Sequence, residues 1–217
     1  MMDLGTRQDR FRQADLYVVI TEAFCDGRSG LDVLDGCLRA GVRLVQFREK
    51  NTSDQILVEK GTAFADRCRE AGALLIVNDR VDIALAIGAD GVHLGQDDLP
   101  IGAARRIAPD LLVGASSHNL DEAMVAQAAG ATYVNIGPIF DTQTKDVPTG
   151  VVGPDMIDTI RPHLNIPFTC MGGLKAHNLH AVVERGTRRV AVVTAVTAAP
   201  DVKAAARELR KAIHAAG

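Results

Sequence analysis

The chain has 217 residues, a hydrophobic fraction of 47% and a mean hydropathy of +0.07, so it is long and apolar enough to bury a large core. A net charge of -3, a pI near 6.1 and an aromatic fraction of 4% without tryptophan argue against nucleic acid as a partner. The sequence has no apolar run of roughly 18 residues for a membrane span and no C-x-x-C pair among its cysteines, so we expect a cytoplasmic protein with no membrane contact and no cysteine-bound metal.

Short apolar runs recur along the chain and predict parallel β-strands separated by helices. The runs are rich in Val, Ile and Leu and lack clean alternation, which is typical of strands covered on both faces. In chain order they are Leu16–Ile20, Leu44–Phe47, Leu74–Val77, Val92–Leu94, Leu111–Val113, Tyr133–Ile136, Phe168–Met171 and Val190–Val193.

Capping residues predict helices between these runs. The expected signals are a cap at Thr52 or Ser53 with an end near Arg69, a cap at Asn119 with an end before Gly130, first-turn prolines at Pro154 and Pro200, and a helix from about His177 to Gly186.

Strands and helices alternate without a linker or a repeat, so we predict an α/β fold consisting of a single (β/α)8 TIM barrel over residues 1–217. Residues 1–13 are interpreted as a polar N-terminal extension of that domain. An open doubly wound sheet is the weaker alternative, because no predicted strand is followed at once by a G-x-G-x-x-G fingerprint.

The second predicted strand ends in a cluster of polar side chains. In a barrel of this kind the chemistry lies at the carboxyl ends of the strands. Alternation along an extended chain places Gln46, Arg48 and Lys50 on one side. Two cations beside an amide suit a diphosphate, although a solvated charged face would have the same pattern.

Carboxylates follow the third and fourth predicted strands. Asp79 comes directly after the third, and Asp97 and Asp98 come after the fourth. Because these strands are neighbours, Asp79 and one of the later two could share Mg²⁺, which takes one or two carboxylates together with phosphate oxygens and water. Each aspartate taken alone would more often be a turn residue.

The loop over residues 137–145 follows the sixth predicted strand and is suited to holding an anion. Gly137 and Pro138 end the strand, and Thr142, Thr144 and Lys145 then provide two hydroxyls and an ammonium group. Such donors suit a phosphate or a pyrophosphate. A solvated surface loop is the alternative for this segment taken alone.

Three further strand ends support an anion site. Ser116 provides a hydroxyl after the fifth predicted strand. Gly172 and Gly173 follow the seventh strand, and Val193 and Thr194 follow the eighth. The last two ends match the phosphate site of many barrels, where a glycine turn and backbone N–H groups surround the anion.

Together these motifs resemble thiamine-phosphate synthases over nearly the whole chain from about Leu16. The motifs are Gln46-Phe47-Arg48-Glu49-Lys50, Asn78-Asp79-Arg80-Val81-Asp82, residues 90–99, Gly114-Ala115-Ser116, residues 137–145, Met171-Gly172-Gly173 and residues 191–195. The resemblance implies a transferase that uses Mg²⁺ to join 4-amino-2-methyl-5-hydroxymethylpyrimidine diphosphate to 4-methyl-5-(2-phosphoethyl)thiazole. It implies two small-molecule substrates as partners and leaves open whether the chain forms a homo-oligomer.

The resemblance also implies roles for single residues. Asp79 and Asp98 resemble the Mg²⁺ ligands, and Arg48, Lys50 and Lys145 resemble the catalytic cations. The substrate-binding set comprises Gln46, Phe47, Arg48, Glu49, Lys50, Asn78, Ser116, Thr142, Gln143, Thr144, Lys145, Gly172, Gly173, Val193 and Thr194. In this reading the cations stabilise negative charge that grows on the leaving diphosphate, and no nucleophilic side chain is required.

Two positions depart from the pattern of the family. Thr194 stands where a serine is usual, and the hydroxyl is kept. Asp141 stands where a proline is common and adds a carboxylate beside an expected anion site.

Other functions remain open at this point. A thiazole tautomerase of the same barrel family could use His118 as general acid and base, but it has no evident use for an aspartate pair. An orienting or capping role for His118 is favoured. A non-catalytic sensor of phosphate ligands is an alternative from another class. His177 and His180 have a spacing that could bind zinc, although exposed histidines on an outer helix are the favoured reading.

Overall fold

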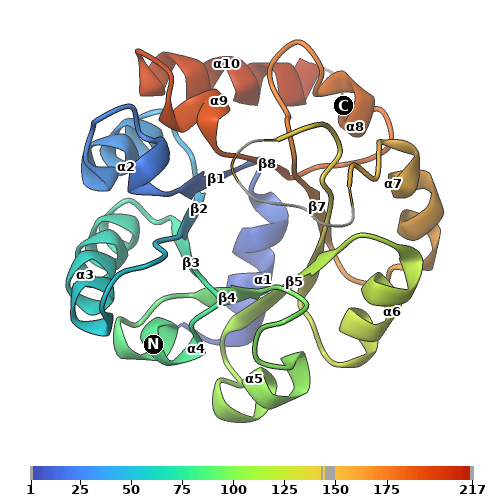
Figure 1. Ribbon diagram of the computed structural model, residues 1–217, viewed down its shortest axis with the longest axis horizontal. Coiled ribbons are helices and arrows are strands. Elements are labelled where there is room, and N and C mark those ends of the chain that lie inside the picture. Colours follow the sequence, from blue (N-terminus) through green and yellow to red (C-terminus); the bar gives the residue numbers. More distant parts are fainter. Residues whose placement is uncertain (1, 143, 145–149, 216–217) are drawn as a thin grey trace.

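The computed structural model describes residues 2–142, 144 and 150–215, and the strands in these ranges close into a parallel barrel surrounded by helices (Figure 1). Each strand pairs with the next along the chain, and Leu16 of β1 pairs with Val190 of β8. This last pairing confirms the predicted (β/α)8 barrel and shows that the open doubly wound sheet is wrong. The strands are β1 (Leu16–Ile20), β2 (Leu44–Phe47), β3 (Leu74–Asn78), β4 (Gly91–Leu94), β5 (Leu112–Ser117), β6 (Tyr133–Ile136), β7 (Phe168–Cys170) and β8 (Val190–Val192).

Strand β5 is longer than the predicted run over residues 111–113. Its ladder with β6 continues through Ser116 and Ser117, which pair with Asn135 and Ile136. Small polar residues at the end of an apolar run suggest a loop, but the backbone pairing is independent of those side chains, and inward positions near the mouth accept hydroxyls. The other strand limits differ from the predicted ones by at most one residue.

Helices α2 to α10 surround the barrel, whereas α1 precedes β1 and packs against the amino end of the barrel. Their bounds are α1 (Leu4–Gln13), α2 (Gly30–Arg39), α3 (Asp54–Glu70), α4 (Val81–Ala86), α5 (Ile101–Ile107), α6 (Leu120–Ala128), α7 (Asp155–Ile160), α8 (His180–Val183), α9 (Thr194–Thr197) and α10 (Val202–Ala215), with 3-10 turns at Glu22–Phe24 and Arg161–His163.

Two of the predicted helix starts are confirmed by their caps. Ser53 rather than Thr52 caps α3, because its Oγ accepts the backbone N–H of Ile56 at 3.3 Å. Asn119 caps α6, with Oδ1 accepting the N–H of Glu122 at 2.9 Å. Side-chain oxygens at this position satisfy N–H groups that have no partner within the helix.

Three helix predictions need correction. Pro200 lies before α10 rather than in its first turn, since the side chain of Asp201 accepts the N–H of Ala204 at 2.9 Å. Pro154 likewise directly precedes α7. The helix predicted from His177 begins only at His180, because the residues before it form turns.

Helix α1 occupies most of the segment expected as a polar N-terminal extension and closes the amino end of the barrel. Its one large apolar anchor, Phe11, is 1% exposed and stacks on Tyr133 with ring centroids 4.4 Å apart. Arg7 is also buried and donates from Nε to Oδ1 of Asp90 at 3.3 Å. Because the helix buries mainly these two side chains, it lacks the apolar stripe by which a helix is recognised in a sequence.

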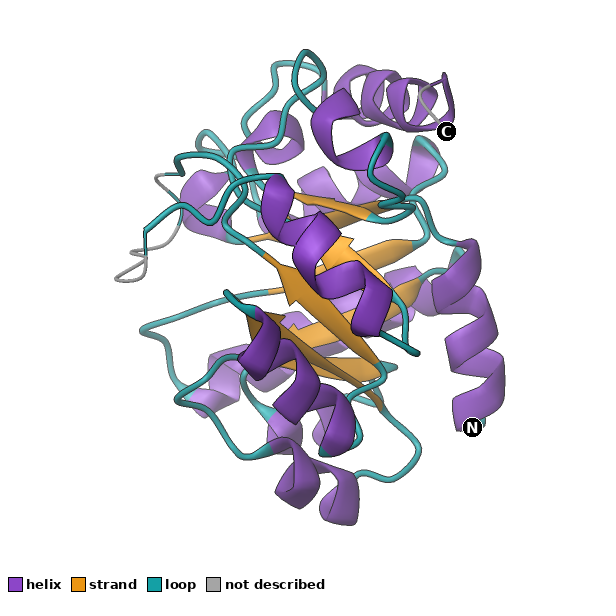
Figure 2. Ribbon diagram, turned by 90° about the vertical axis from the view of Figure 1, so that its right-hand side faces the viewer, coloured by secondary structure: helices purple, strands orange, loops and turns teal. Residues whose placement is uncertain are grey.

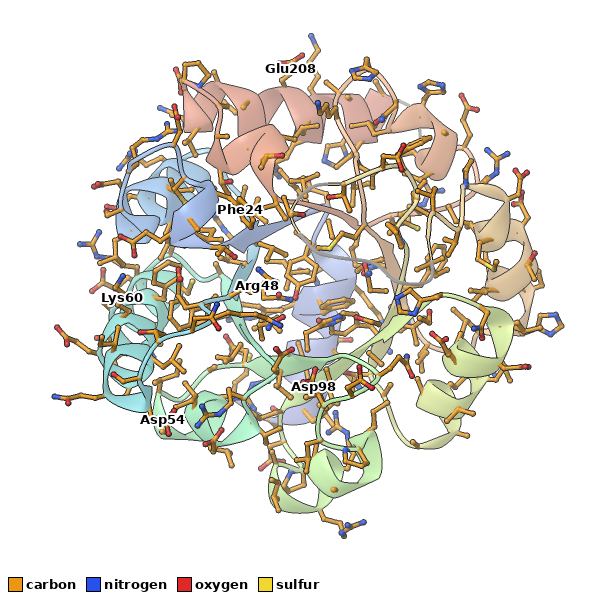
Figure 3. All side chains as sticks on the ribbon, in the orientation of Figure 1. Phe24, Arg48, Asp54, Lys60, Asp98 and Glu208 are labelled. Carbon is orange, nitrogen blue, oxygen red and sulfur yellow. The ribbon has the colours of Figure 1, made fainter. Side chains whose placement is uncertain are left out.

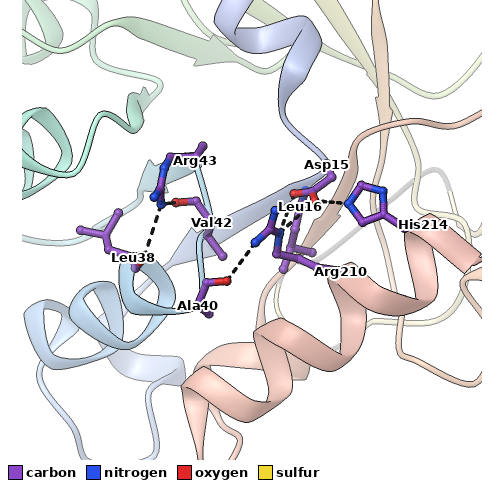
Figure 4. Close-up of polar contacts among 8 residues, drawn as sticks. All are labelled: Asp15, Leu16, Leu38, Ala40, Val42, Arg43, Arg210 and His214. Carbon is purple, nitrogen blue, oxygen red and sulfur yellow. Dashed lines mark hydrogen bonds and ion pairs between the residues drawn. The ribbon is translucent and has the colours of Figure 1, made fainter.

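Helix α10 is fastened to the amino end of β1 by an ion-pair cluster (Figure 4). Nε of Arg210 donates to both oxygens of Asp15, at 2.9 and 3.1 Å, and its Nη1 donates to the carbonyl of Ala40 at 2.9 Å. Nε2 of His214 lies 2.8 Å from Oδ2 of Asp15. Both α1 and α10 therefore contact the amino end of the barrel, and Figure 2 shows the N and C labels on the same side.

Alternation along the strands divides the core into an outer and an inner part. Leu16, Val18 and Ile20 belong to the cluster between strands and helices, whereas Tyr17 packs inside with Phe11 and other inward residues. Inward side chains near the carboxyl ends of the strands are consequently free to line a site. Among the described residues, no helix has the length and apolar content that a membrane crossing requires.

Candidate active site

A cavity of about 760 Å³ lies at the carboxyl ends of the strands. Figure 3 shows Arg48 and Asp98 inside the ring of outer helices, whereas Asp54, Lys60 and Glu208 lie on those helices. The site residues expected from the sequence that line this cavity are Gln46, Arg48, Lys50, Asn78, Asp79, Asp98, Ser116, Thr142, Thr144, Gly172, Gly173, Val193 and Thr194.

Two residues of the β2 motif lie outside the cavity lining. Phe47 is 2% exposed and packs outward against Phe64, with ring centroids 4.9 Å apart. Glu49 turns away and its Oε1 accepts the N–H of Glu22 at 2.8 Å, while burial raises the pKa of its carboxyl group. Both belong to the motif that predicts substrate binding, but strand alternation directs them away from the site.

Asp79 and Asp98 form the acidic side of the cavity. Burial, followed by a hydrogen bond and charge repulsion from Asp98, raises the pKa of Asp79, and the ammonium group of Lys50 opposes the shift. The Nζ of Lys50 lies 3.3 Å from Oδ2 of Asp79. Asp79 also has a φ of 63°, a left-handed conformation that aspartate tolerates better than most residues.

Asp98 is fixed by the turn that follows β4. Its Oδ2 accepts the N–H of Gly95 at 2.6 Å. Asp97 also lines the cavity, but it is exposed, whereas Asp98 is half-buried and interacts with Asp79. These differences favour Asp98 as the partner of Asp79.

The carboxylate pair fits a hard divalent cation. Two carboxylates whose charges oppose each other would be relieved by Mg²⁺, which commonly uses one or two carboxylates and takes its other oxygens from water or a phosphate. Over the described ranges, no group of three or more His, Cys, Asp or Glu side chains is placed to bind a metal. The donor set thus suits a cation shared with a substrate better than one held entirely by protein.

Glycine turns bring the backbone close to the cavity after β7. Gly172 and Gly173 have φ values of 108° and 60°, which other residues rarely adopt. A Cβ on Gly172 would come within 2.5 Å of Pro138, and one on Gly173 would overlap the backbone of Asp141. Thr194 begins α9 after β8 and also lines the cavity.

The loop after β6 is described only in part. The Oγ1 atoms of Thr142 and Thr144 are 3.0 Å apart, and both side chains line the cavity. Asp141 lines it as well and is exposed. The expected site residues Gln143 and Lys145 lie outside the described residues.

A buried network of polar side chains that the sequence motifs do not indicate lies beneath the cavity. Tyr17 and His93 line the cavity, and Tyr133 lies below them in the inner core. Burial raises the pKa of both tyrosines, so the phenols stay neutral. Tyr17 and His93 occupy inward positions in otherwise apolar strands, and a polar group at such a position is the signal that could have indicated them.

The contacts and exposure of His118, His177 and His180 fit structural or surface roles. Nδ1 of His118 lies 2.8 Å from Oε2 of Glu122, which also accepts the backbone N–H of His118 at 2.8 Å. His118 still lines the cavity. His177 and His180 are exposed, and the described part of the chain places no group of metal-binding side chains around them.

Known proteins match this chain along most of its length. The family model described as thiamine monophosphate synthase matches residues 16–196. A thiamine-phosphate synthase of Chloroflexus aurantiacus is 46% identical over 90% of either chain, and one of Shouchella clausii is 39% identical over 93% of this chain and 97% of its own. The structure of a thiamine phosphate pyrophosphorylase from Pyrococcus furiosus superposes with a TM-score of 0.87 at 35% identity, covering 96% of this chain and 98% of the other.

Proposed function

The chain belongs to the thiamine monophosphate synthase family, and on that basis we propose that it joins a pyrimidine diphosphate to a thiazole phosphate in the barrel cavity. The substrates are 4-amino-2-methyl-5-hydroxymethylpyrimidine diphosphate and 4-methyl-5-(2-phosphoethyl)thiazole. The bond from the pyrimidine methylene carbon to the diphosphate oxygen breaks, and its electron pair stays with the oxygen. The lone pair of the thiazole nitrogen then forms the new C–N bond, which gives thiamine phosphate and pyrophosphate.

The observation that carries this proposal is the distribution of charge around the cavity. Arg48, Lys50, Asp79 and Asp98 follow β2, β3 and β4. The glycine turn at Gly172 follows β7. In the closed barrel β7 lies opposite β3. Two opposite binding regions suit two phosphorylated substrates whose reacting atoms must meet between them.

The cationic side chains hold and stabilise the leaving diphosphate. When bound to Asp79 and Asp98, Mg²⁺ would neutralise diphosphate charge and make pyrophosphate a better leaving group. Arg48 and Lys50 follow β2 and line the same cavity. They offer further positive charge to the diphosphate, on which negative charge develops as the carbon–oxygen bond breaks. Lys145 is proposed to add a third cation from the loop after β6.

The glycine turn and Thr194 are proposed to anchor the phosphate of the thiazole. Backbone N–H groups in a turn and at the start of a helix donate to phosphate oxygens without the entropy cost of ordering a long side chain. A thiazole held by its phosphate needs no activation, because its nitrogen already carries the attacking lone pair.

The first prediction concerns the overall reaction. With both substrates and Mg²⁺, the purified protein is expected to form thiamine phosphate and pyrophosphate in equal amounts, and EDTA is expected to stop the reaction. Anion-exchange chromatography measures the thiamine phosphate, and a coupled assay with inorganic pyrophosphatase measures the pyrophosphate. Full turnover in EDTA, or isomerisation of the thiazole phosphate without the pyrimidine, would contradict the proposal.

A second prediction separates this function from a tautomerase. His118→Ala is expected to lower kcat by less than about 10-fold, because His118 is bound by Glu122 and the proposed transfer needs no side-chain base. A general acid and base would cost about 10²- to 10⁴-fold when removed. Glu122→Gln is the matched control, since it perturbs the orientation of His118 but keeps the imidazole. A loss in the larger range would favour the tautomerase.

A further inference from the structure

A continuous hydrogen-bonded chain crosses the interior of the barrel and ends on two residues of the cavity. Nε2 of Gln46 donates to the hydroxyl oxygen of Tyr17 at 2.6 Å. The hydroxyl oxygens of Tyr17 and Tyr133 are 3.1 Å apart. Tyr133 lies 3.1 Å from Nδ1 of His93, and Nε2 of His93 lies 3.1 Å from Oγ of Ser116.

One consistent direction of donation runs through the whole network when Nε2 of Gln46 is the first donor. The oxygen of Tyr17 accepts from Gln46, so its own proton is available for the oxygen of Tyr133. Tyr133 then donates to Nδ1 of His93, and a neutral imidazole in that state carries its proton on Nε2. His93 accordingly donates from Nε2 to the oxygen of Ser116.

This direction determines what the two end residues can offer to a ligand. Because Nε2 of Gln46 is engaged with Tyr17, its Oε1 is available to the cavity as an acceptor. Because Oγ of Ser116 accepts from His93, its proton is free to be donated. The site therefore presents an acceptor from β2 and a donor from β5.

Packing holds the chain in place. Tyr17 and Tyr133 are buried, with exposed fractions of 1% and 0%. Their rings meet edge to face with centroids 6.3 Å apart. Phe11 of α1 stacks on Tyr133 from the amino end of the barrel. Gly114 leaves the space that the Tyr133 ring fills, since a Cβ there would overlap it. Buried phenols in such a setting have few other partners, so the network is strongly directed.

We propose that Tyr17, Tyr133 and His93 are positioning residues that fix Gln46 as an acceptor and Ser116 as a donor. The pair then selects a flat heteroaromatic ring with an amino group on one edge and an unprotonated ring nitrogen on another. An oxo group in place of the amino group reverses the donor and opposes the oxygen of Gln46. This inference deepens the proposed function and rests on it for the identity of the ring.

The test compares selectivity rather than activity alone. For wild type and Tyr17→Phe, kcat/KM is measured with the 4-aminopyrimidine diphosphate and with its 4-oxo analogue. Loss of the Tyr17 hydroxyl releases Nε2 of Gln46, so the amide can turn and present its N–H to the ring. The preference for the amino substrate is expected to fall by about 10-fold or more, because a site that hydrogen-bonds a polar group rejects its analogue strongly only while its own groups are fixed.

Thr132→Val is the matched control. It also removes one buried hydroxyl from the barrel. That hydroxyl bonds to the backbone of Val113 and takes no part in the hydrogen-bonded network of Tyr17, Tyr133 and His93. Its preference ratio is expected to equal that of the wild type. An unchanged ratio in Tyr17→Phe, with both substrates slowed equally, would overturn the inference.

Tyr133→Phe and the double variant test whether the chain acts as a unit. Tyr133→Phe is expected to lower the preference in the same direction, and the double variant is expected to be no less selective than Tyr17→Phe, since one break already frees Gln46. If Tyr17→Phe folds poorly, Tyr133→Phe alone tests the expected fall in the preference for the amino substrate. Multiplicative losses in the double variant would mean that the tyrosines act separately and would overturn the inference.

Ligand binding separates failure of this inference from failure of the proposed function. Calorimetry with the free 4-amino and 4-oxo pyrimidine alcohols needs no turnover. If the wild type forms no thiamine phosphate, the proposed function is wrong, yet a binding preference lost in Tyr17→Phe would still support the positioning roles. Equal binding of both rings by the wild type would overturn them.

Discussion

Asp79→Ala is expected to lower kcat/KM of the magnesium-dependent reaction by about 10³-fold, since a bound metal contributes several kcal/mol to stabilising transition-state charge. The carboxylate lies at a strand end, beside Lys50 and within reach of Asp98, so its loss removes charge without opening the hydrophobic core. Asp98→Asn should behave similarly while keeping an acceptor for the N–H of Gly95. Activity is measured against Mg²⁺ concentration, and thermal unfolding checks the fold.

Asp97→Ala provides the matched control for this prediction. Asp97 lines the same cavity but is exposed, whereas the raised pKa of Asp79 comes from burial and from Asp98. Its removal is expected to change kcat/KM by less than about 10-fold, as is usual for a solvent-screened charge. Equal losses in Asp97→Ala and Asp98→Asn, or unchanged rates in Asp79→Ala, would refute the assignment of the metal ligands.

The raised pKa of Asp79 adds a pH dependence with a definite sign. A carboxyl group with a raised folded-state pKa stabilises the metal-free fold below its unfolded pKa, and this contribution is lost as the pH rises through the folded value. Magnesium needs the ionised form, so its affinity should fall as the pH is lowered toward that value. Calorimetric titration of Mg²⁺ at several pH values should show this trend in the wild type and not in Asp79→Asn.

Arg48→Ala is expected to lower kcat and kcat/KM together by about 10²- to 10³-fold, as for other preorganised contacts to growing charge. Its guanidinium lines the cavity and is steadied by Nη1, which donates to Oγ1 of Thr21 at 3.3 Å. Arg48→Lys should restore activity only in part, because an ammonium group cannot offer two parallel donors to a phosphate.

Arg80→Ala is the control for Arg48. Arg80 follows the next strand, but it pairs with Asp54 and Asp82 and is absent from the described lining of the cavity. Little change in kcat is expected for it. A rise in KM for the thiazole phosphate alone in Arg48→Ala would move Arg48 to the other substrate.

Local patterns explain why much of the cavity could be predicted. Gln46, Arg48 and Lys50 share a side because side chains alternate along an extended segment, and this rule depends on neighbouring residues only. The same rule would have excluded Phe47 and Glu49, which were included because they belong to a motif.

The missing features depend on contacts between distant residues. Tyr17 and Tyr133 are separated by 116 positions, so no local pattern announces their hydrogen bond. Helix α1 is likewise defined by the contact of Phe11 with Tyr133 and not by its own periodicity. These contacts form only when the barrel closes, so the pattern of any single segment does not predict them.

The location of α1 and α10 has a practical consequence for building larger assemblies. Both helices contact the amino end of the barrel, where Phe11 stacks on Tyr133 and Arg210 binds Asp15, whereas the cavity opens at the other end. A second enzyme fused through either helix, or a solid support attached there, would therefore sit behind the barrel and leave the mouth facing the substrates.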